Sequence, residues 1–156
     1  MSNPLITIGI ATFNAIDTAE RAIYSALSQS WRPIEIIIID DNSTDGTFEI
    51  LLNLASKHNE IRVFKNKINH GIGFVRNRII EESKGVFLAF FDDDDESDID
   101  RLKIQYERII KYKNTYNPPY PIICHTNRQI KFINGESRLY KTMGIHKNRK
   151  CPNGEN

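Results

Sequence analysis

One stretch decides the fold of this chain: VFLAFFDDDDE, residues 86–96. Its first part, residues 86–91, is apolar without alternation, which is typical of a fully buried strand. The strand leads directly into four aspartates, Asp92 to Asp95, whose carboxylates repel one another unless solvent or a cation surrounds them. A solvated acidic loop is the usual interpretation of such a charge block. The buried strand before it favours a ligand site instead, because open α/β sheets bind ligands at the carboxyl ends of their strands.

The acidic cluster favours a particular kind of cation. Oxygen-only ligands on a short turn suit Mg²⁺ or Mn²⁺, which take phosphate oxygens as further ligands. The alternating acidic residues that begin at Asp92 also resemble a calcium-binding EF-hand loop, which needs Gly at its sixth position and Glu at its twelfth. Ser97 and Lys103 occupy those positions, so an EF-hand is excluded.

Upstream of this stretch, strand-like and helix-like segments alternate. β-Branched and other apolar residues predict strands over residues 5–11, 34–39 and 61–64. Helices are predicted between the strands, over residues 17–30, from the turn after residue 40 to about residue 57, and over residues 74–83. Such alternation predicts right-handed βαβ crossovers, and therefore an α/β fold with a mostly parallel, Rossmann-like sheet and helices on both faces.

Two local signals predict how these helices begin and end. Asp17 with Glu20 three residues later fits a capping box at the start of the first helix. Gly85 is expected to close the third helix as a residue able to take a positive φ.

Downstream of the aspartates, a fourth helix is predicted over residues 99–114. Strands are predicted over residues 121–126 and 128–133, and the second of these is expected to form a hairpin with residues 137–141 through Asn134-Gly135. We assign residues 1–142 to one α/β domain and residues 143–156, which are polar and lack a period, to a tail.

Charge is divided unevenly along the chain. Residues 1–100 carry nine basic and 17 acidic side chains, whereas residues 101–156 carry 12 basic and three acidic ones. An acidic half suits a metal, and a basic half attracts phosphate or an anionic surface, although solvation of one helix face and a tail gives the same excess.

Composition and terminal sequence also predict the cellular compartment of the protein. The two cysteines, Cys124 and Cys151, lie far apart without a CxxC pattern, which fits a reduced compartment. The start of the chain lacks the pattern of a secretory signal, and no apolar run approaches the ~20 residues of a membrane span. We therefore expect a cytoplasmic protein without a transmembrane segment, which leaves peripheral membrane contact open.

Three of the predicted strands end in polar groups that a parallel sheet would bring to one edge. The first ends at residues 11–14, the second at Asp40 and Asp41, and the fourth at the aspartates. These groups can line one crevice. The crevice carries neither a dinucleotide fingerprint, because Gly71-x-Gly73 lacks the third glycine, nor a P-loop.

Four segments of the sequence together resemble a known family. PLITIGIATFN (4–14) looks like an opening strand, IDDNSTDGT (39–47) resembles a DD-x-S-x-D-x-T signature, GIGFVRNR (71–78) is similar to a G…ARN segment, and DDDD (92–95) matches a DxD metal motif. In this order they resemble the inverting family 2 glycosyltransferases of GT-A fold, over about residues 4–110.

The resemblance implies a nucleotide-sugar donor, most commonly a UDP-sugar, and a divalent metal, Mn²⁺ or Mg²⁺. The nucleotide would be bound by Ala11, Phe13, Asn14, Asp41, Arg76, Asp92 and Asp93, and the metal by Asp92 and Asp94. In particular, Asp41 would accept a hydrogen bond from the imide N–H of a uracil-like base, and Arg76 would face the base or the diphosphate. Without the resemblance, Asp41 could be a turn-capping aspartate and Arg76 one half of a surface ion pair.

The resemblance also implies transfer with inversion to a saccharide, lipid-linked or protein acceptor, with no nucleic acid as partner. Such a transfer needs a general base. Only Glu107, Glu136 and Glu155 follow Asp100 among acidic residues, and none stands in the family's context, so the base is unassigned and the acceptor-binding half is expected to be missing. Two alternatives remain: a donor-binding module without turnover, and a nucleotidyltransferase, whose glycine-rich basic loop residues 11–15 do not match.

Overall fold

The structure is a computed structural model that describes residues 2–125, 128–131 and 135–140. The chain divides into two compact units, Met1–Ile104 and Gln105–Asn156, which are described separately. In the described residues, no helix is both long and apolar enough to cross a membrane.

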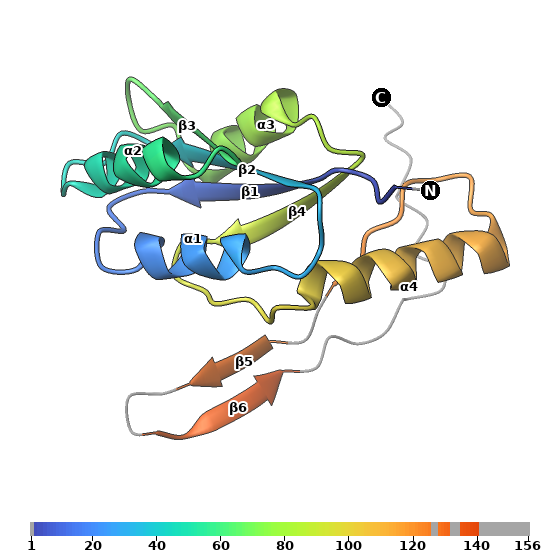
Figure 1. Ribbon diagram of the computed structural model, residues 1–156. Helices are drawn as coiled ribbons and strands as arrows, with labels where there is room; N and C mark the ends of the chain where they lie inside the picture. Colours follow the sequence, from blue (N-terminus) through green and yellow to red (C-terminus); the bar gives the residue numbers. More distant parts are fainter. Residues whose placement is uncertain (1, 126–127, 132–134, 141–156) are drawn as a thin grey trace, which may run out of the picture. The chain divides into compact units, whose positions relative to one another are not determined.

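The first unit is a four-stranded parallel sheet with helices between successive strands (Figure 1). Its strands are β1 (Ile6–Thr12), β2 (Ile34–Asp40), β3 (Ile61–Lys65) and β4 (Phe87–Asp92), in the order β3-β2-β1-β4. Its helices are α1 (Ala19–Leu27), α2 (Thr47–Lys57) and α3 (Ile72–Glu82), and α4 (Arg101–Tyr116) begins in it. The predicted mostly parallel, Rossmann-like sheet is therefore confirmed.

Strand β2 forms the centre of the core, and every one of its seven residues is buried. Ile37 and Ile39 pack against Val75 and Ile79 of α3. Because successive side chains of a strand point to opposite faces, the neighbouring isoleucines of β2 face away from α3, where α1 and α2 contact each other and the sheet. This two-sided burial explains why the sequence of β2 lacks alternation.

The strand register places the three polar strand ends side by side. Ala11 of β1 pairs with Ile39 of β2 on one side and with Asp92 of β4 on the other. One residue further, Thr12 pairs with Asp40. The crevice predicted at this edge is therefore built from β1, with β2 and β4 as its neighbours.

Both predicted helix-end signals are wrong in detail. Helix α1 begins after Thr18 without a side-chain cap, because the backbone amides of Thr18 and Ala19 donate to the carbonyl of Ala15 instead. Helix α3 ends at Glu82, Ser83 after it is extended, and Gly85 is not among the glycines with positive φ. Gly85 is needed for space: a Cβ there would lie 2.5 Å from the backbone nitrogen of Thr7.

The second unit contains most of α4 and the strands β5 (Arg128–Lys131) and β6 (Ser137–Tyr140), which pair antiparallel. Asn134 of the predicted hairpin turn and the predicted boundary at residue 142 lie outside the described residues. The strand predicted over 121–126 is wrong for residues 121–125, which form no regular structure. A strand needs a neighbour to accept its hydrogen bonds, and the described residues provide none there.

Candidate functional site

A cavity of about 310 Å³ opens at the carboxyl edge of the sheet in the first unit. Its size lies at the lower end of the usual range for small-molecule sites, ~300–1,000 Å³. The lining residues come from the ends of three strands and the start of α3: Ala11, Thr12, Phe13, Asp41, Asn69, Gly71, Ile72, Val75 and Asp93. The structure therefore brings residues that are up to 82 positions apart in the sequence around one space.

Four predicted site residues line this cavity: Ala11, Phe13, Asp41 and Asp93. The other four, Asn14, Arg76, Asp92 and Asp94, are not among its lining residues. Sequence reasoning did not single out the contributions of Asn69, Ile72 and Val75. The helical apolar spacing of Ile72, Val75 and Ile79 was the available signal for the last two.

Hydrogen bonds from three residues fix the side chain of Asp41 in the cavity wall. Its carboxylate accepts hydrogen bonds from the side-chain amide of Asn66 at 2.6 Å, from the backbone N–H of Gly71 at 2.7 Å, and from that of His70 at 3.0 and 3.1 Å. Only 3% of the residue is exposed. Burial raises the pKa of Asp41, but the hydrogen bonds from Asn66, His70 and Gly71 together lower it below its ordinary value. Asp41 is therefore an ionised acceptor at neutral pH.

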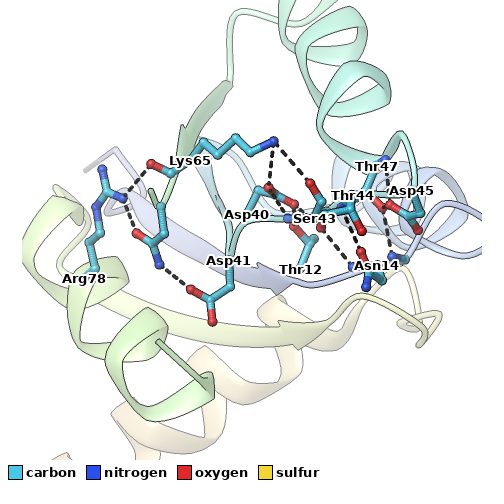
Figure 2. Close-up of polar contacts among 12 residues, drawn as sticks. Thr12, Asn14, Asp40, Asp41, Ser43, Thr44, Asp45, Thr47, Lys65 and Arg78 are labelled. Atoms are coloured by element: carbon cyan, nitrogen blue, oxygen red, sulfur yellow. Dashed lines mark hydrogen bonds and ion pairs between the residues drawn. The ribbon is translucent and has the colours of Figure 1, made fainter. Parts of the chain in front are cut away.

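The turn after Asp41 is shaped by the other residues of the segment 39–47 (Figure 2). Asp40 is fully buried and accepts hydrogen bonds from the backbone N–H and the hydroxyl of Ser43. Asp45 accepts from the hydroxyl of Thr47 at 2.6 Å and from its backbone N–H at 3.0 Å at the start of α2. Hydrogen bonding to Thr47 keeps the pKa of Asp45 below its ordinary value. These residues hold the loop in shape and leave Asp41 to face the cavity.

Asn14 joins the first strand end to the same turn (Figure 2). Its φ is 50°, its side-chain oxygen accepts from the backbone N–H of Thr44 at 3.0 Å, and its own N–H donates to the hydroxyl of Ser43 at 2.9 Å. Asparagine tolerates this left-handed conformation better than most residues. Asn14 therefore has a local role in positioning the loop, and its contact with a nucleotide stays a prediction.

The first aspartate of the acidic cluster lies beside Arg76. The guanidinium of Arg76 is 3.4 Å from the Asp92 carboxylate, and both side chains are about half exposed. Such an exposed ion pair contributes little to stability. The geometry thus matches a surface ion pair, and it also keeps a permanent cation at the edge of the sheet.

Asp93 differs from its neighbours because it turns into the cavity and is partly buried. Burial raises the pKa of Asp93, with further increases from the nearby charges of Asp94 and Asp92, while a hydrogen bond from the backbone of Phe13 opposes these effects. Asp92 and Asp94 are exposed.

The acidic turn is anchored by Arg101, which sequence reasoning missed. Its guanidinium donates to the carbonyl of Phe90 at 2.9 Å and to the hydroxyl of Ser97 at 2.8 Å, and it lies 4.1 Å from the centre of the Phe91 ring. Burial lowers the pKa of Arg101, and the charges of Asp92 and Asp95 oppose this. Arg101 therefore links Phe90 of β4, before the aspartates, to Ser97, which follows them.

The donor set of this turn fits a hard cation that is completed by a substrate. In the described part of the chain, no group of three or more His, Cys, Asp or Glu residues is arranged to hold a metal ion. Mg²⁺ needs only one or two carboxylates when substrate phosphates supply further oxygens. Asp92 and Asp94 offer such exposed carboxylates.

The fold and the crevice define a class of protein. A parallel sheet with a cavity at its carboxyl edge is common to α/β proteins that bind ligands there, and the similar solved structures identify the GT-A type of this fold. TarS 1-349 from S. aureus in complex with UDP is similar with a TM-score of 0.60 and 19% identity, over 90% of this chain and 47% of that one. The mannosyltransferase PcManGT from Pyrobaculum calidifontis, in complex with GDP-Man and Mn²⁺, is similar with a TM-score of 0.59 and 22% identity, over 64% of this chain and 30% of that one.

The family follows from the sequence match. The family model "Glycosyl transferase family 2" matches residues 7–152, so the chain belongs to this glycosyltransferase family. One relative is the Escherichia coli enzyme named UDP-Glc:alpha-D-GlcNAc-diphosphoundecaprenol beta-1,3-glucosyltransferase WfaP, 42% identical over 91 residues, which are 58% of this chain and 36% of the relative. The chain spans less than half the length of the curated relatives it matches.

Proposed function

We propose that the cavity binds the nucleotide of a UDP-sugar, and that this chain is the donor-binding part of a glycosyltransferase that transfers the sugar to an acceptor hydroxyl with inversion. The observation that carries the proposal is the Asp41 carboxylate, which is nearly buried, held by hydrogen bonds and part of the cavity wall. A carboxylate has about four acceptor positions. Three protein N–H groups donate to it here, with the N–H of His70 shared between its two oxygens, so a ligand N–H would be its fourth donor.

A uracil ring supplies such a donor in its imide N–H. Ala11 and Phe13 line the same cavity and would frame the base, with Phe13 49% exposed and free to pack against a ring. Asn14 would hold the loop that carries Phe13, and Asp93, which reaches the cavity from the β4 end, would accept from the ribose hydroxyls.

The diphosphate would lie toward the acidic turn. Asp92 and Asp94 would hold Mn²⁺ or Mg²⁺, which neutralises the charge that develops on a nucleoside diphosphate leaving group. Arg76, beside Asp92, would face the phosphates, since its planar fork matches their oxygens. The Mn²⁺ in the PcManGT complex supports a divalent metal, but the choice between Mn²⁺ and Mg²⁺ stays open.

The acceptor is the least constrained part of the proposal. The name of the WfaP relative specifies a sugar on diphosphoundecaprenol, which supports a lipid-linked saccharide as the acceptor and contact with a membrane surface. No general base is assigned. Of the candidates named from the sequence, Glu107 and Glu136 belong to the second unit, and Glu155 lies outside the described residues.

Calorimetry with UDP and pyrophosphate, each with Mn²⁺, tests the site. Asp41→Ala should weaken UDP binding by about tenfold or more, as expected for a hydrogen bond to a charged group, and should leave pyrophosphate unchanged. Asp17→Ala, which removes an exposed aspartate outside the cavity lining, is the matched control. Equal weakening of both ligands by Asp41→Ala would refute base recognition by Asp41.

A sugar-transfer assay separates the enzyme from a donor-binding module without turnover. Loss of a general base costs about 10²–10⁴-fold in rate, so we expect this chain to bind UDP-sugar and to transfer it slowly or not at all. Robust transfer to added acceptors would place a base within these 156 residues. A nucleotidyltransferase would instead release pyrophosphate from UTP, which the same assay can detect.

A further inference from the structure

Asp41 is connected to a residue that lies outside the cavity. Asn66 follows β3, and its side-chain amide donates to Asp41 at 2.6 Å. The oxygen of the same amide accepts from the guanidinium of Arg78 in α3, also at 2.6 Å, and Arg78 donates further to the carbonyl of Lys65 at 3.3 Å. Figure 2 shows Asp41 and Arg78 at the two ends of this line of hydrogen bonds. Neither Asn66 nor Arg78 lines the cavity.

The chemistry of the two ends fixes the orientation of the amide between them. A carboxylate only accepts and a guanidinium only donates, so the nitrogen of Asn66 must face Asp41 and its oxygen must face Arg78. Asn66 is 5% exposed and Asp41 3% exposed, so water does not compete for these bonds. Hydrogen bonds that are linked in this way polarise one another in a medium of low dielectric.

We propose that Asn66 and Arg78 are positioning residues that hold the Asp41 carboxylate for recognition of a base through its ring N–H. This inference rests on the proposed function of Asp41. Asn66 and the N–H of His70 share one carboxylate oxygen, and the N–H groups of His70 and Gly71 share the other. These bonds fix the rotation of the carboxylate, so a ring N–H of the ligand would meet an acceptor that is already oriented.

A purely structural role would have a different consequence. If the three side chains only fasten β3 and α3 to the end of β2, then breaking the link disturbs the whole cavity and weakens every ligand alike. If they position Asp41, then the loss is confined to ligands that have a ring N–H. Three ligands distinguish these cases: UDP, N3-methyl-UDP, which lacks the N–H, and pyrophosphate, which lacks the base.

Two variants break the link at different points. Asn66→Asp keeps the shape of the side chain but places a second acceptor against Asp41, and Arg78→Met removes the guanidinium and leaves Asn66 in place. Arg62→Met is the matched control, because Arg62 and Arg78 each lie 5.2 Å from the centre of the Phe64 ring. The ion pairs of Arg62 are with Glu35 and Glu82, and none leads to Asp41.

The experiment is calorimetry on the full chain with Mn²⁺ and each of the three ligands. We expect Asn66→Asp to weaken UDP about tenfold or more, as for a lost hydrogen bond to a charged group. Arg78→Met should weaken it about two- to tenfold, which is the lower part of the range of coupling between linked side chains. N3-methyl-UDP and pyrophosphate should change less than twofold. Arg78→Lys should recover part of the loss, and Arg62→Met should bind all three ligands as the unaltered chain does.

Equal weakening of all three ligands, or unchanged UDP binding in a folded Arg78→Met variant, would overturn the positioning role. If Asn66→Asp does not fold, ligand binding by Arg78→Met distinguishes the positioning role from the purely structural one. A failure of the proposed function gives a different result: the unaltered chain itself would bind UDP no better than pyrophosphate, and Asp41→Ala would leave UDP binding unchanged.

Discussion

Replacing Gly85 by alanine tests the account of how the edge strand β4 is attached to the sheet. Gly85 stands two residues before β4, where its N–H donates to the hydroxyl of Thr7 at 2.9 Å. That hydroxyl donates in turn to the carboxylate of Glu35 at 2.6 Å, and Thr7 is fully buried. An added Cβ would lie 2.5 Å from the backbone nitrogen of Thr7 and 2.8 Å from the carbonyl oxygen of Phe87.

The expected loss of unfolding free energy in Gly85→Ala follows from these contacts. Two of the opposing atoms are backbone atoms of a sheet, so neither can rotate away, and the chain at residue 85 must move by several tenths of an ångström. Overpacking of this kind costs about 1–3 kcal/mol, and the lost hydrogen bond to Thr7 adds about 1 kcal/mol. We expect Gly85→Ala to lower the free energy of unfolding by about 2–4 kcal/mol, which lowers Tm by about 10 °C or more in a unit of this size.

Urea denaturation followed by tryptophan fluorescence measures this change, because the single tryptophan, Trp31, is buried in the first unit. Gly73→Ala is the matched control. It stands in α3 with nothing within 4 Å of the added Cβ, and alanine there should stabilise the helix by up to about 1 kcal/mol. An unfolding free energy for Gly85→Ala within about 0.5 kcal/mol of the unaltered chain, the usual range for harmless surface changes, would refute the steric argument.

Three further predictions concern the site. Asp94→Ala should remove the Mn²⁺-dependent part of UDP binding without a change in Tm, whereas Glu96→Gln should not; calorimetry with and without Mn²⁺ decides, and unchanged metal dependence in Asp94→Ala rejects the metal role. Arg101→Met should lower the unfolding free energy by about 2–4 kcal/mol in urea titrations, because it removes two hydrogen bonds from a charged donor; a loss below about 0.5 kcal/mol contradicts this. Because the pKa of Asp41 is lower in the folded chain than its ordinary value, its ionised form favours folding above about pH 4, and this contribution is lost as the pH falls through the folded pKa. The stability difference between the unaltered chain and Asp41→Asn should therefore shrink below pH 4 in thermal melts, and a constant difference would contradict the assignment.

Sequence patterns alone were enough to predict the strands and helices of the first unit and its fold class. The apolar runs of β2 and β4 and the alternation with helices predicted a parallel sheet, because burial of strands and helix faces depends on periods that are local to each segment. The sequence also marked Asp41 and the aspartates from Asp92, because open α/β sheets bind ligands at the carboxyl ends of their strands. Local signals failed where long-range contacts decide the structure: Gly85 is glycine because Thr7 lies against it, and the described residues offer no partner strand to residues 121–125.

Which side chains meet depends on how the strands and helices pack together. Asp41, Asn66 and Arg78 are separated by 25 and 12 positions, and nothing in their sequence spacing relates them. Asn66 reaches Asp41 because β3 lies beside β2, and Arg78 reaches Asn66 because α3 packs on one face of β2. In the same way, Arg76 meets Asp92 because α3 packs against β1 and β4 lies beside β1. Sequence patterns specify the face that each residue buries, whereas hydrogen-bond partners depend on strand order, which the packing of the whole unit sets.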